Sequence, residues 1–251
     1  MTAETAPPRP EPELLGQIVI AIGGSAGIGL ETARRARVGG ADVVLTGRNP
    51  ERLAEAADEV GAMSTAAFDA TDGAALKRFF DDLADPIDHV IVTGPGPSYA
   101  PLLEMDADQV LHALGDHVVL GLEVARNAAP KMRPGGTLIL MGGTGGRKIS
   151  RELGLVSAAT AALPPFAAAL ALQLAPIRVN LIAAGFVDTP LSASLLGEGL
   201  EARREELRST LPIGRVVGPA DVAALAVHLM INTAVTGATY DIDGGQQFVS
   251  G

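Results

Sequence analysis

The sequence predicts an α/β protein, built as a single doubly wound parallel sheet of about seven strands with helices on both faces. Short, wholly apolar runs alternate along the chain with stretches long enough to be helices. Such runs are typical of parallel strands that are buried on both faces. The first run ends in glycines, and no second core, internal repeat or linker interrupts the 251 residues. We therefore expect one domain.

The strands and helices follow from the order of the apolar runs. Strands are expected at 18–22, 43–45, 62–68, 89–92, 137–141, 177–183 and 239–242. Helices are expected at 28–38, from Pro50 with Asn49 as cap, at 72–83 with Asp72 as cap, at 106–132 until Pro134-Gly135-Gly136, and at 152–175. Pro164 and Pro165 lie inside the last helix. Because proline removes helical hydrogen bonds, they predict a kink near Thr160.

Composition and charge exclude several classes of protein. Lys and Arg number 19 against 29 Asp and Glu, a formal net charge of −10, so no nucleic-acid partner is expected. Cysteine is absent, which excludes disulfides and thiolate sites, and no metal site is expected. No apolar run is expected to reach the roughly 18 residues of a membrane span. Residues 1–13 are proline-rich and lack a signal pattern, so we expect a flexible tail, a domain at 14–251 and a cytoplasmic protein without membrane contact.

A glycine-rich segment, Gly23-Gly24-Ser25-Ala26-Gly27-Ile28-Gly29, joins the first strand to the first helix. Glycines there allow the backbone to approach a pyrophosphate closely, and the helix N-terminus adds free N–H groups and the positive end of its dipole. An ordinary strand-to-helix turn is the alternative. Because the loop opens the β–α–β series, we expect a dinucleotide to contact Gly23, Ser25, Ala26, Gly27, Ile28 and Gly29.

Residues 16–249 resemble the short-chain dehydrogenase/reductase family, which has a Rossmann fold. The family's loop reads Thr-Gly-x-x-x-Gly-x-Gly; here Ile22 takes the threonine place and the glycines are intact. The segment 184–189 resembles the family's Pro-Gly-x-x-x-Thr with its proline lost. Further matches are Asp69-Ala70-Thr71-Asp72, Ile177-Arg178-Val179-Asn180, Pro212-Ile213-Gly214-Arg215, Thr236-Gly237 and Asp241-Ile242-Asp243-Gly244-Gly245.

NADP(H) is the expected cofactor. At the end of the second strand, an acid binds the ribose 2′-hydroxyl of NAD, whereas an arginine accepts the 2′-phosphate of NADP. Here that end has Arg48 and no acid, and a planar guanidinium suits a phosphate. A solvated surface arginine is the alternative. The resemblance implies that Asp69 binds the adenine amino group, with a turn residue as the alternative. It assigns further cofactor contacts to Asn49, Ala70, Gly94, Gly185, Val187 and Thr189; for the last three, an ordinary strand-exit loop is the alternative.

The resemblance fails at the catalytic positions. Family members use a tyrosine as proton donor, a lysine one helical turn later, a serine that polarises the carbonyl and an asparagine that anchors a water relay. Neither of the two tyrosines, Tyr99 and Tyr240, is followed four residues later by a lysine. Counted from the flanking motifs, these four places are taken by Val156, Thr160, Gly143 and His117. Because imidazole titrates near neutral pH, His117 is the candidate acid or base, with a packed or exposed helical histidine as the alternative.

Other polar residues fall near these positions. A one-residue shift of the alignment brings in Thr144, Ser157 or Asp116, but neither a tyrosine nor a lysine. Arg147 and Lys148 follow the fifth strand, where they either place a cation near the cofactor or form a solvated loop pair. Tyr99 follows the fourth strand, where it either meets substrate or covers the mouth of the cleft.

Three explanations remain open: nucleotide binding without reaction, redox chemistry with other residues, or a different reaction in the same cleft. We expect an NADP(H)-binding short-chain dehydrogenase/reductase-like oxidoreductase with a small-molecule substrate and weak or absent ketoreductase activity. A non-catalytic nucleotide-binding regulator and a pure assembly partner are the alternatives. The resemblance also implies a homo-oligomer, a dimer or tetramer, for which the last long helix offers Leu153, Leu155, Ala158, Ala159, Ala161, Ala162, Ala168 and Ala169.

Overall fold

The predicted fold class is confirmed by the computed structural model, which describes residues 13–84, 86–94, 96, 101–147 and 153–249. Seven strands form one sheet in the order β3-β2-β1-β4-β5-β6-β7, and neighbouring strands pair in parallel throughout. The strands are β1 (Ile18–Ile22), β2 (Asp42–Gly47), β3 (Ser64–Ala67), β4 (Ile87–Val92), β5 (Met132–Gly143), β6 (Arg178–Ala184) and β7 (Thr239–Ile242).

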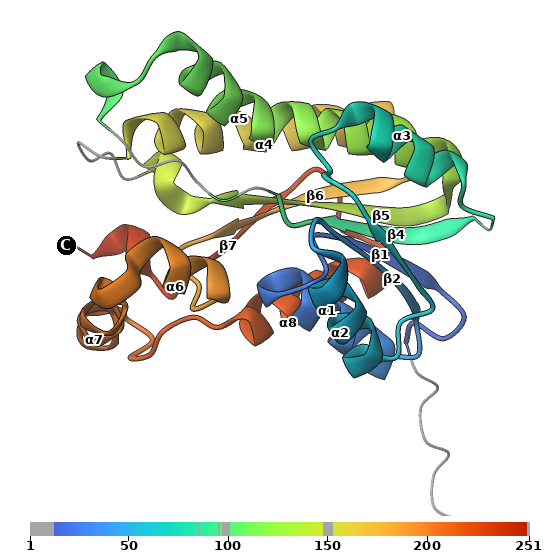
Figure 1. The fold of residues 1–251 in the computed structure, drawn as a ribbon, viewed down its shortest axis with the longest axis horizontal. Coiled ribbons are helices and arrows are strands. Elements are labelled where there is room, and N and C mark those ends of the chain that lie inside the picture. Colours follow the sequence, from blue (N-terminus) through green and yellow to red (C-terminus); the bar gives the residue numbers. More distant parts are fainter. Residues whose placement is uncertain (1–12, 85, 95, 97–100, 148–152, 250–251) are drawn as a thin grey trace, which may run out of the picture.

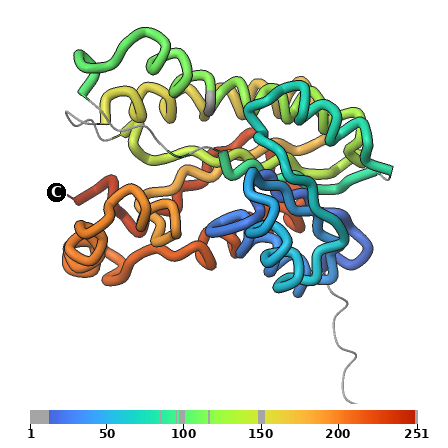
Figure 2. The backbone as a smooth tube through the Cα atoms, viewed as in Figure 1, coloured from blue at the N-terminus to red at the C-terminus, as the bar shows by residue number. Residues whose placement is uncertain are grey.

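Helices cover both faces of the sheet. They are α1 (Gly27–Val38), α2 (Pro50–Val60), α3 (Gly73–Asp81), α4 (Ala107–Ala128), α5 (Gly154–Gln173), α6 (Pro190–Leu196), α7 (Leu200–Thr210) and α8 (Pro219–Ile231). Short 3₁₀ turns are η1 (Leu102–Glu104), η2 (Ala129–Lys131), η3 (Thr144–Arg147), η4 (Gly197–Gly199) and η5 (Gln246–Phe248). Figure 1 shows α3, α4 and α5 over one face, and α1, α2 and α8 over the other. In the tube of Figure 2, the blue N-terminal helices share a layer with the orange-red α8, while the green and yellow middle of the chain forms the opposite layer.

The interior strand β1 shows why its own sequence is apolar at every position. Val19 and Ala21 belong to the core under α1 and α8, whereas Ile20 and Ile22 belong to the core under α4 and α5. Successive side chains of a strand point to opposite faces. Because both faces of β1 are covered, each of its positions takes an apolar side chain.

Two predicted helix caps are confirmed. The side chain of Asn49 accepts a hydrogen bond from the backbone N of Arg52 at 2.7 Å and starts α2. The carboxylate of Asp72 accepts from the backbone N of Ala74 and Ala75 at 2.9 and 3.1 Å and starts α3. Both caps supply acceptors for N–H groups that have no partner within the helix.

Several predicted boundaries differ from the structure, and two of the differences change the interpretation. The third strand covers only Ser64–Ala67 of the expected 62–68. The helix expected at 106–132 ends at Ala128, and the Pro-Gly-Gly segment taken as its stop belongs to β5, which starts at Met132. At Gly136 a Cβ would lie only 2.3 Å from the carbonyl oxygen of Asp88, and the register between β4 and β5 shifts there. Gly136 therefore allows β4 and β5 to approach each other closely.

The expectation that no apolar run has the length of a membrane span is wrong for α5. By length and composition alone this helix is long and apolar enough to cross a membrane. It packs on β5 and β6, and it buries Leu155, Leu163 and Leu170 in the protein core. A core helix passes the same test of length and composition. Helix α5 also runs unbroken through Pro164 and Pro165.

Candidate functional site

The glycine loop after β1 is held in shape by Thr93, which directly follows β4. Gly23 has a φ of +86°, and a Cβ there would lie 2.4 Å from Thr93 Oγ1; a Cβ on Gly29 would lie 2.3 Å from the Gly23 carbonyl oxygen. Only glycine fits both positions. The Thr93 hydroxyl donates to the carbonyl oxygens of Ile22 and Gly23 at 2.9 and 3.1 Å. Sequence reasoning missed Thr93, although a hydroxyl residue at the end of the strand beside β1 was a signal for it.

The N-terminus of α1 is free of capping side chains. Its cap residue, Ala26, has no side-chain acceptor, and the first turn of the helix contains no acidic residue. The N–H groups of Gly27, Ile28 and Gly29 belong to this first turn, where a helix has no internal acceptors. Ser25 lies beside the end of β2, since a Cβ on Gly47 would be 3.0 Å from Ser25 Oγ. The loop thus presents backbone donors and one hydroxyl beside the carboxyl ends of β1 and β2, an arrangement that suits an anion.

Arg48 and Asp69 lie near each other at the ends of β2 and β3. Arg48 is exposed and has no hydrogen bond or ion pair in the part of the chain that the structure describes. Asp69 Oδ1 accepts from the backbone N and the hydroxyl of Thr71, at 3.0 and 2.8 Å. These bonds, and in lesser degree the Arg48 charge, hold the pKa of Asp69 below its ordinary value against a small opposing effect of burial. Asn49, in contrast, is engaged as the cap of α2.

Ala70, Gly94 and Leu120 come together beside this corner. Ala70 and Leu120 both line a shallow groove of about 260 Å³ between the start of α3 and helix α4. A Cβ on Gly94 would lie 3.5 Å from Leu120 Cδ2. These three residues therefore form an apolar corner next to Asp69.

The segment after β6 reaches the glycine loop. Gly185 donates its backbone N–H to the Ile242 carbonyl oxygen at 3.2 Å, and Val187 pairs with Val217 in an isolated bridge. Thr189 caps α6 by accepting from the backbone N of Ser192. A Cβ on Gly27 would lie 3.5 Å from the Cβ of Thr189. Two segments separated by about 160 residues, both predicted to bind the cofactor, are thus in contact.

Three of the four predicted catalytic positions form one cluster. A Cβ on Gly143 would lie 3.3 Å from Thr160 Cγ2, and one on Gly145 would lie 3.7 Å from Val156 Cγ1 and 3.8 Å from Thr160 Oγ1. The hydroxyl of Thr160 donates to the Val156 carbonyl oxygen at 2.7 Å, and that of Ser157 donates to the Gly145 carbonyl oxygen at 2.8 Å. Both hydroxyls therefore bond backbone carbonyls, and none of these five residues has a titratable side chain.

His117 is not joined to that cluster by any hydrogen bond of the described residues. It is half-buried on α4, with Nδ1 3.3 Å from the Ala113 carbonyl oxygen of its own helix. Thr144 is buried at the start of η3. Asp116 belongs to α4, but its side chain lies outside the described part of the structure. The acid or base role of His117 remains a prediction.

Arg147 forms its polar contacts with the edge strand β7 and the turn that follows it. It forms an ion pair with Asp241 of β7 and donates to Gln247 Oε1 at 3.0 Å. The bond to Asp241 raises the pKa of Arg147 above its ordinary value. Arg147 is exposed, as the solvated-loop alternative expected, while a role near the cofactor stays a prediction. Lys148 and Tyr99 lie outside the described residues, and Tyr240 is in β7.

One family model and one characterised protein each match most of this chain. Residues 23–247 match the family model described as enoyl-(acyl carrier protein) reductase. An NADP-dependent (R)-specific alcohol dehydrogenase of Lentilactobacillus kefiri is 29% identical over 247 residues, which cover 92% of this chain and 97% of that protein.

Two solved structures show the same fold at similar identity. The MalC reductase/Diels-Alderase from Malbranchea aurantiaca has a TM-score of 0.87 and 25% identity, with 96% of this chain and 100% of that one covered. BdcA, solved in complex with NADPH, has a TM-score of 0.82 and 26% identity, with 92% and 95% covered.

Proposed function

Because this chain belongs to the short-chain dehydrogenase/reductase family of oxidoreductases, we propose that it binds NADP(H) at the carboxyl edge of its sheet. The observation that carries this choice of cofactor is Arg48. Its guanidinium is exposed at the end of β2 without an ion-pair partner among the described residues, and β2 ends without an acid. A phosphate on the ribose 2′ position would meet a free planar cation there.

The rest of the edge fits the other parts of a dinucleotide. The uncapped first turn of α1 suits its diphosphate, with donors from Gly27, Ile28 and Gly29. Asp69 keeps its second carboxylate oxygen available for the adenine amino group, while Thr71 occupies the first. Ala70, Gly94 and Leu120 offer the adenine an apolar corner, and Gly185, Val187 and Thr189 lie where the chain would hold the nicotinamide end. When bound, the cofactor supplies or accepts a hydride.

We propose further that conventional ketoreductase activity is weak or absent. Hydride transfer to a carbonyl leaves an alkoxide that needs a proton, and the cluster of Gly143, Val156 and Thr160 contains no side chain acidic enough to serve as the donor: its one hydroxyl, that of Thr160, bonds the Val156 carbonyl oxygen. The described lysines lie elsewhere. Lys77 pairs with Asp81 on α3. Lys131, which directly precedes β5, donates to the backbone carbonyl oxygens of Asp81 and Leu83. A missing general acid or oxyanion donor typically costs about 10²- to 10⁴-fold in rate.

A second candidate function is a reaction without proton or hydride transfer in the same cleft. The similar fold from Malbranchea aurantiaca is named as a reductase and as a Diels-Alderase. A cycloaddition forms its bonds within the substrate and requires no acid from the protein. A site that lacks acid and lysine but retains the cofactor framework is compatible with such chemistry.

Titration of the purified protein with NADPH and NADH, followed by a panel of carbonyl and alcohol substrates at the nicotinamide absorbance, tests these proposals. We expect saturable NADPH binding and little absorbance change with the panel. Absence of dinucleotide binding would contradict the proposed function. Rapid turnover by the wild type that collapses in His117→Ala would instead show that His117 is the missing acid.

A further inference from the structure

Helices α6 and α7 are attached to the protein by few apolar side chains. Helix α6 buries none of its residues, and α7 buries only Leu207. Apolar burial is the main source of packing energy for a surface helix. Polar contacts must therefore contribute much of what fixes the position of this pair.

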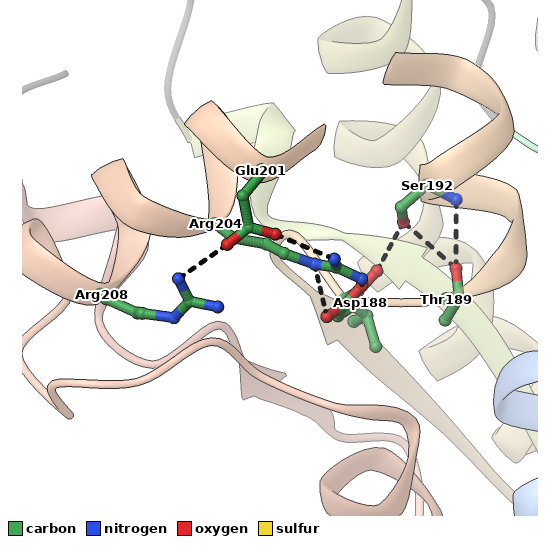
Figure 3. Close-up of polar contacts among 7 residues, drawn as sticks. Asp188, Thr189, Ser192, Glu201, Arg204 and Arg208 are labelled. Carbon is green, nitrogen blue, oxygen red and sulfur yellow. Dashed lines mark hydrogen bonds and ion pairs between the residues drawn. The ribbon is translucent and has the colours of Figure 1, made fainter. Parts of the chain in front are cut away.

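The strongest of these contacts is a fork between Arg204 of α7 and Asp188, shown in Figure 3. Arg204 Nε donates to Asp188 Oδ2 at 2.9 Å, and Nη2 donates to Oδ1 at 2.8 Å. Glu201 accepts from Arg204 Nη1 at 3.1 Å with one oxygen and from Arg208 at 3.0 Å with the other. Two parallel bonds fix the direction of both side chains as well as their separation.

Asp188 belongs to the segment that meets the glycine loop. Its backbone N donates to the Val217 carbonyl oxygen at 2.9 Å. Ser192 closes the turn by donating to the Val187 carbonyl oxygen at 2.5 Å and by bonding the Thr189 hydroxyl at 3.1 Å. The fork thus connects α7 to Asp188. The next residue, Thr189, lies against Gly27 at the start of α1.

We propose that Arg204 is a positioning residue for the dinucleotide: through Asp188 it holds Thr189 over Gly27 and so sets the affinity for the nicotinamide half of the cofactor. This inference rests on the proposed function. The adenine end depends on Arg48 and Asp69, and neither of them bonds to the fork among the described residues. Loss of the fork therefore acts on one end of the ligand only. By linkage, a bound dinucleotide also stabilises the docked position of α7.

The test compares two probes in equilibrium titrations. NADPH has both ends, whereas adenosine 2′-monophosphate has the adenine and the 2′-phosphate but neither the diphosphate that would lie at the start of α1 nor the nicotinamide. In Arg204→Gln we expect NADPH to bind about fivefold more weakly, at the lower end of measured coupling between sites, and the monophosphate to bind as in the wild type. Arg203→Gln is the matched control, because the Arg203 side chain is 31% exposed against 29% for Arg204 and its ion pair among the described residues is with Glu206 in its own helix.

Two more variants keep the test decisive if Arg204→Gln loses its cooperative melting transition. Arg204→Lys keeps the charge without the fork and should give an intermediate loss, while Asp188→Asn should match Arg204→Gln with no further loss in the double variant. Equal weakening of both probes, no weakening of NADPH, or the same loss in Arg203→Gln would overturn the inference alone. Failure of the wild type to bind either probe would overturn the proposed function, and this inference with it.

Discussion

At the scale of single residues, His89 couples the stability of the fold to pH. It lies in β4 with only 3% of its surface exposed, and its Nε2 is 2.6 Å from Gln17 Oε1. Its Nδ1 is buried without a hydrogen-bond partner among the described residues. Burial lowers the pKa of His89 to about 4; Asp88 opposes this shift and Arg178 adds to it. Between about pH 4 and pH 6.5 the folded protein therefore holds a neutral imidazole where the unfolded chain holds a charged one.

We expect the free energy of unfolding to fall as the pH is lowered from about 6.5 to about 4, because the unfolded state binds a proton in this window that the folded state does not. The difference in pKa corresponds to roughly 3 kcal/mol at most. Urea unfolding of wild type and His89→Leu across this window measures the effect, and His112→Gln on the exposed face of α4 is the control. Identical pH dependence in wild type and His89→Leu would contradict the assignment.

Residue roles were predictable from the sequence where the chemistry is local. The caps Asn49 and Asp72 act on residues two or three positions away, so their identity was sufficient. The roles of Thr93 and Asp188 depend on partners that folding brings near: Thr93 bonds a residue 71 positions earlier and Asp188 one 16 positions later. The sequence does not show which segments are neighbours, so the only signal for Thr93 was a hydroxyl residue at a strand end, and there was none for Asp188.

At the scale of elements, β5 and α5 form the part of the site that lacks an acid. The boundary of β5 was missed because proline and glycine usually end an element, whereas here Gly136 permits contact with the Asp88 backbone. The meeting of Gly143 with Val156 and Thr160 was predictable, since the aligned motifs place them at the end of one strand and on one helix face. The hydrogen bond from the Ser157 hydroxyl to the Gly145 carbonyl oxygen was not predictable.

The triple variant Gly143→Ser, Val156→Tyr and Thr160→Lys restores the family's residues. It should reduce carbonyl substrates with NADPH at a rate about 10²-fold or more above that of the wild type. The serine replaces a glycine whose Cβ would lie 3.3 Å from Thr160 Cγ2, and the lysine removes that branch. The matched control carries Phe instead of Tyr at 156 and so lacks only the phenol. Equal rates in the Tyr and Phe versions, followed at the nicotinamide absorbance, would show that no proton donor has been restored.

At the scale of the whole molecule, α5 leaves an apolar face uncovered. Ala158, Ala161, Ala162 and Ala169 are exposed, Leu172 is 84% exposed, and the helix has no charged residue. Leu155 and Ala159, which the sequence offered for an interface, are buried in the core of the same chain. We propose that a second copy covers the remaining face, giving a homodimer or a larger homo-oligomer.

Light scattering at micromolar concentration measures this association. The wild type should be larger than a monomer, and Ala162→Glu should shift it toward the monomer, because a buried carboxylate at a tight helix contact is not compensated. Ala54→Glu on the exposed surface of α2 is the control and should leave the mass unchanged. A monomeric wild type, or an Ala162→Glu variant of unchanged mass, would contradict the proposed interface.

The most direct test of the proposed function is the ratio of the dissociation constants of NADH and NADPH, measured by calorimetric titration in the wild type and in Arg48→Ala. We predict a ratio well above one in the wild type. Arg48→Ala should weaken NADPH by roughly 1.5–3 kcal/mol, the value of a charge-assisted phosphate contact, and leave NADH unchanged, so the ratio falls. Arg52→Ala, which removes an exposed arginine from the first turn of α2, should keep the wild-type ratio. Equal affinities in the wild type, or a ratio that survives in Arg48→Ala, would contradict the account.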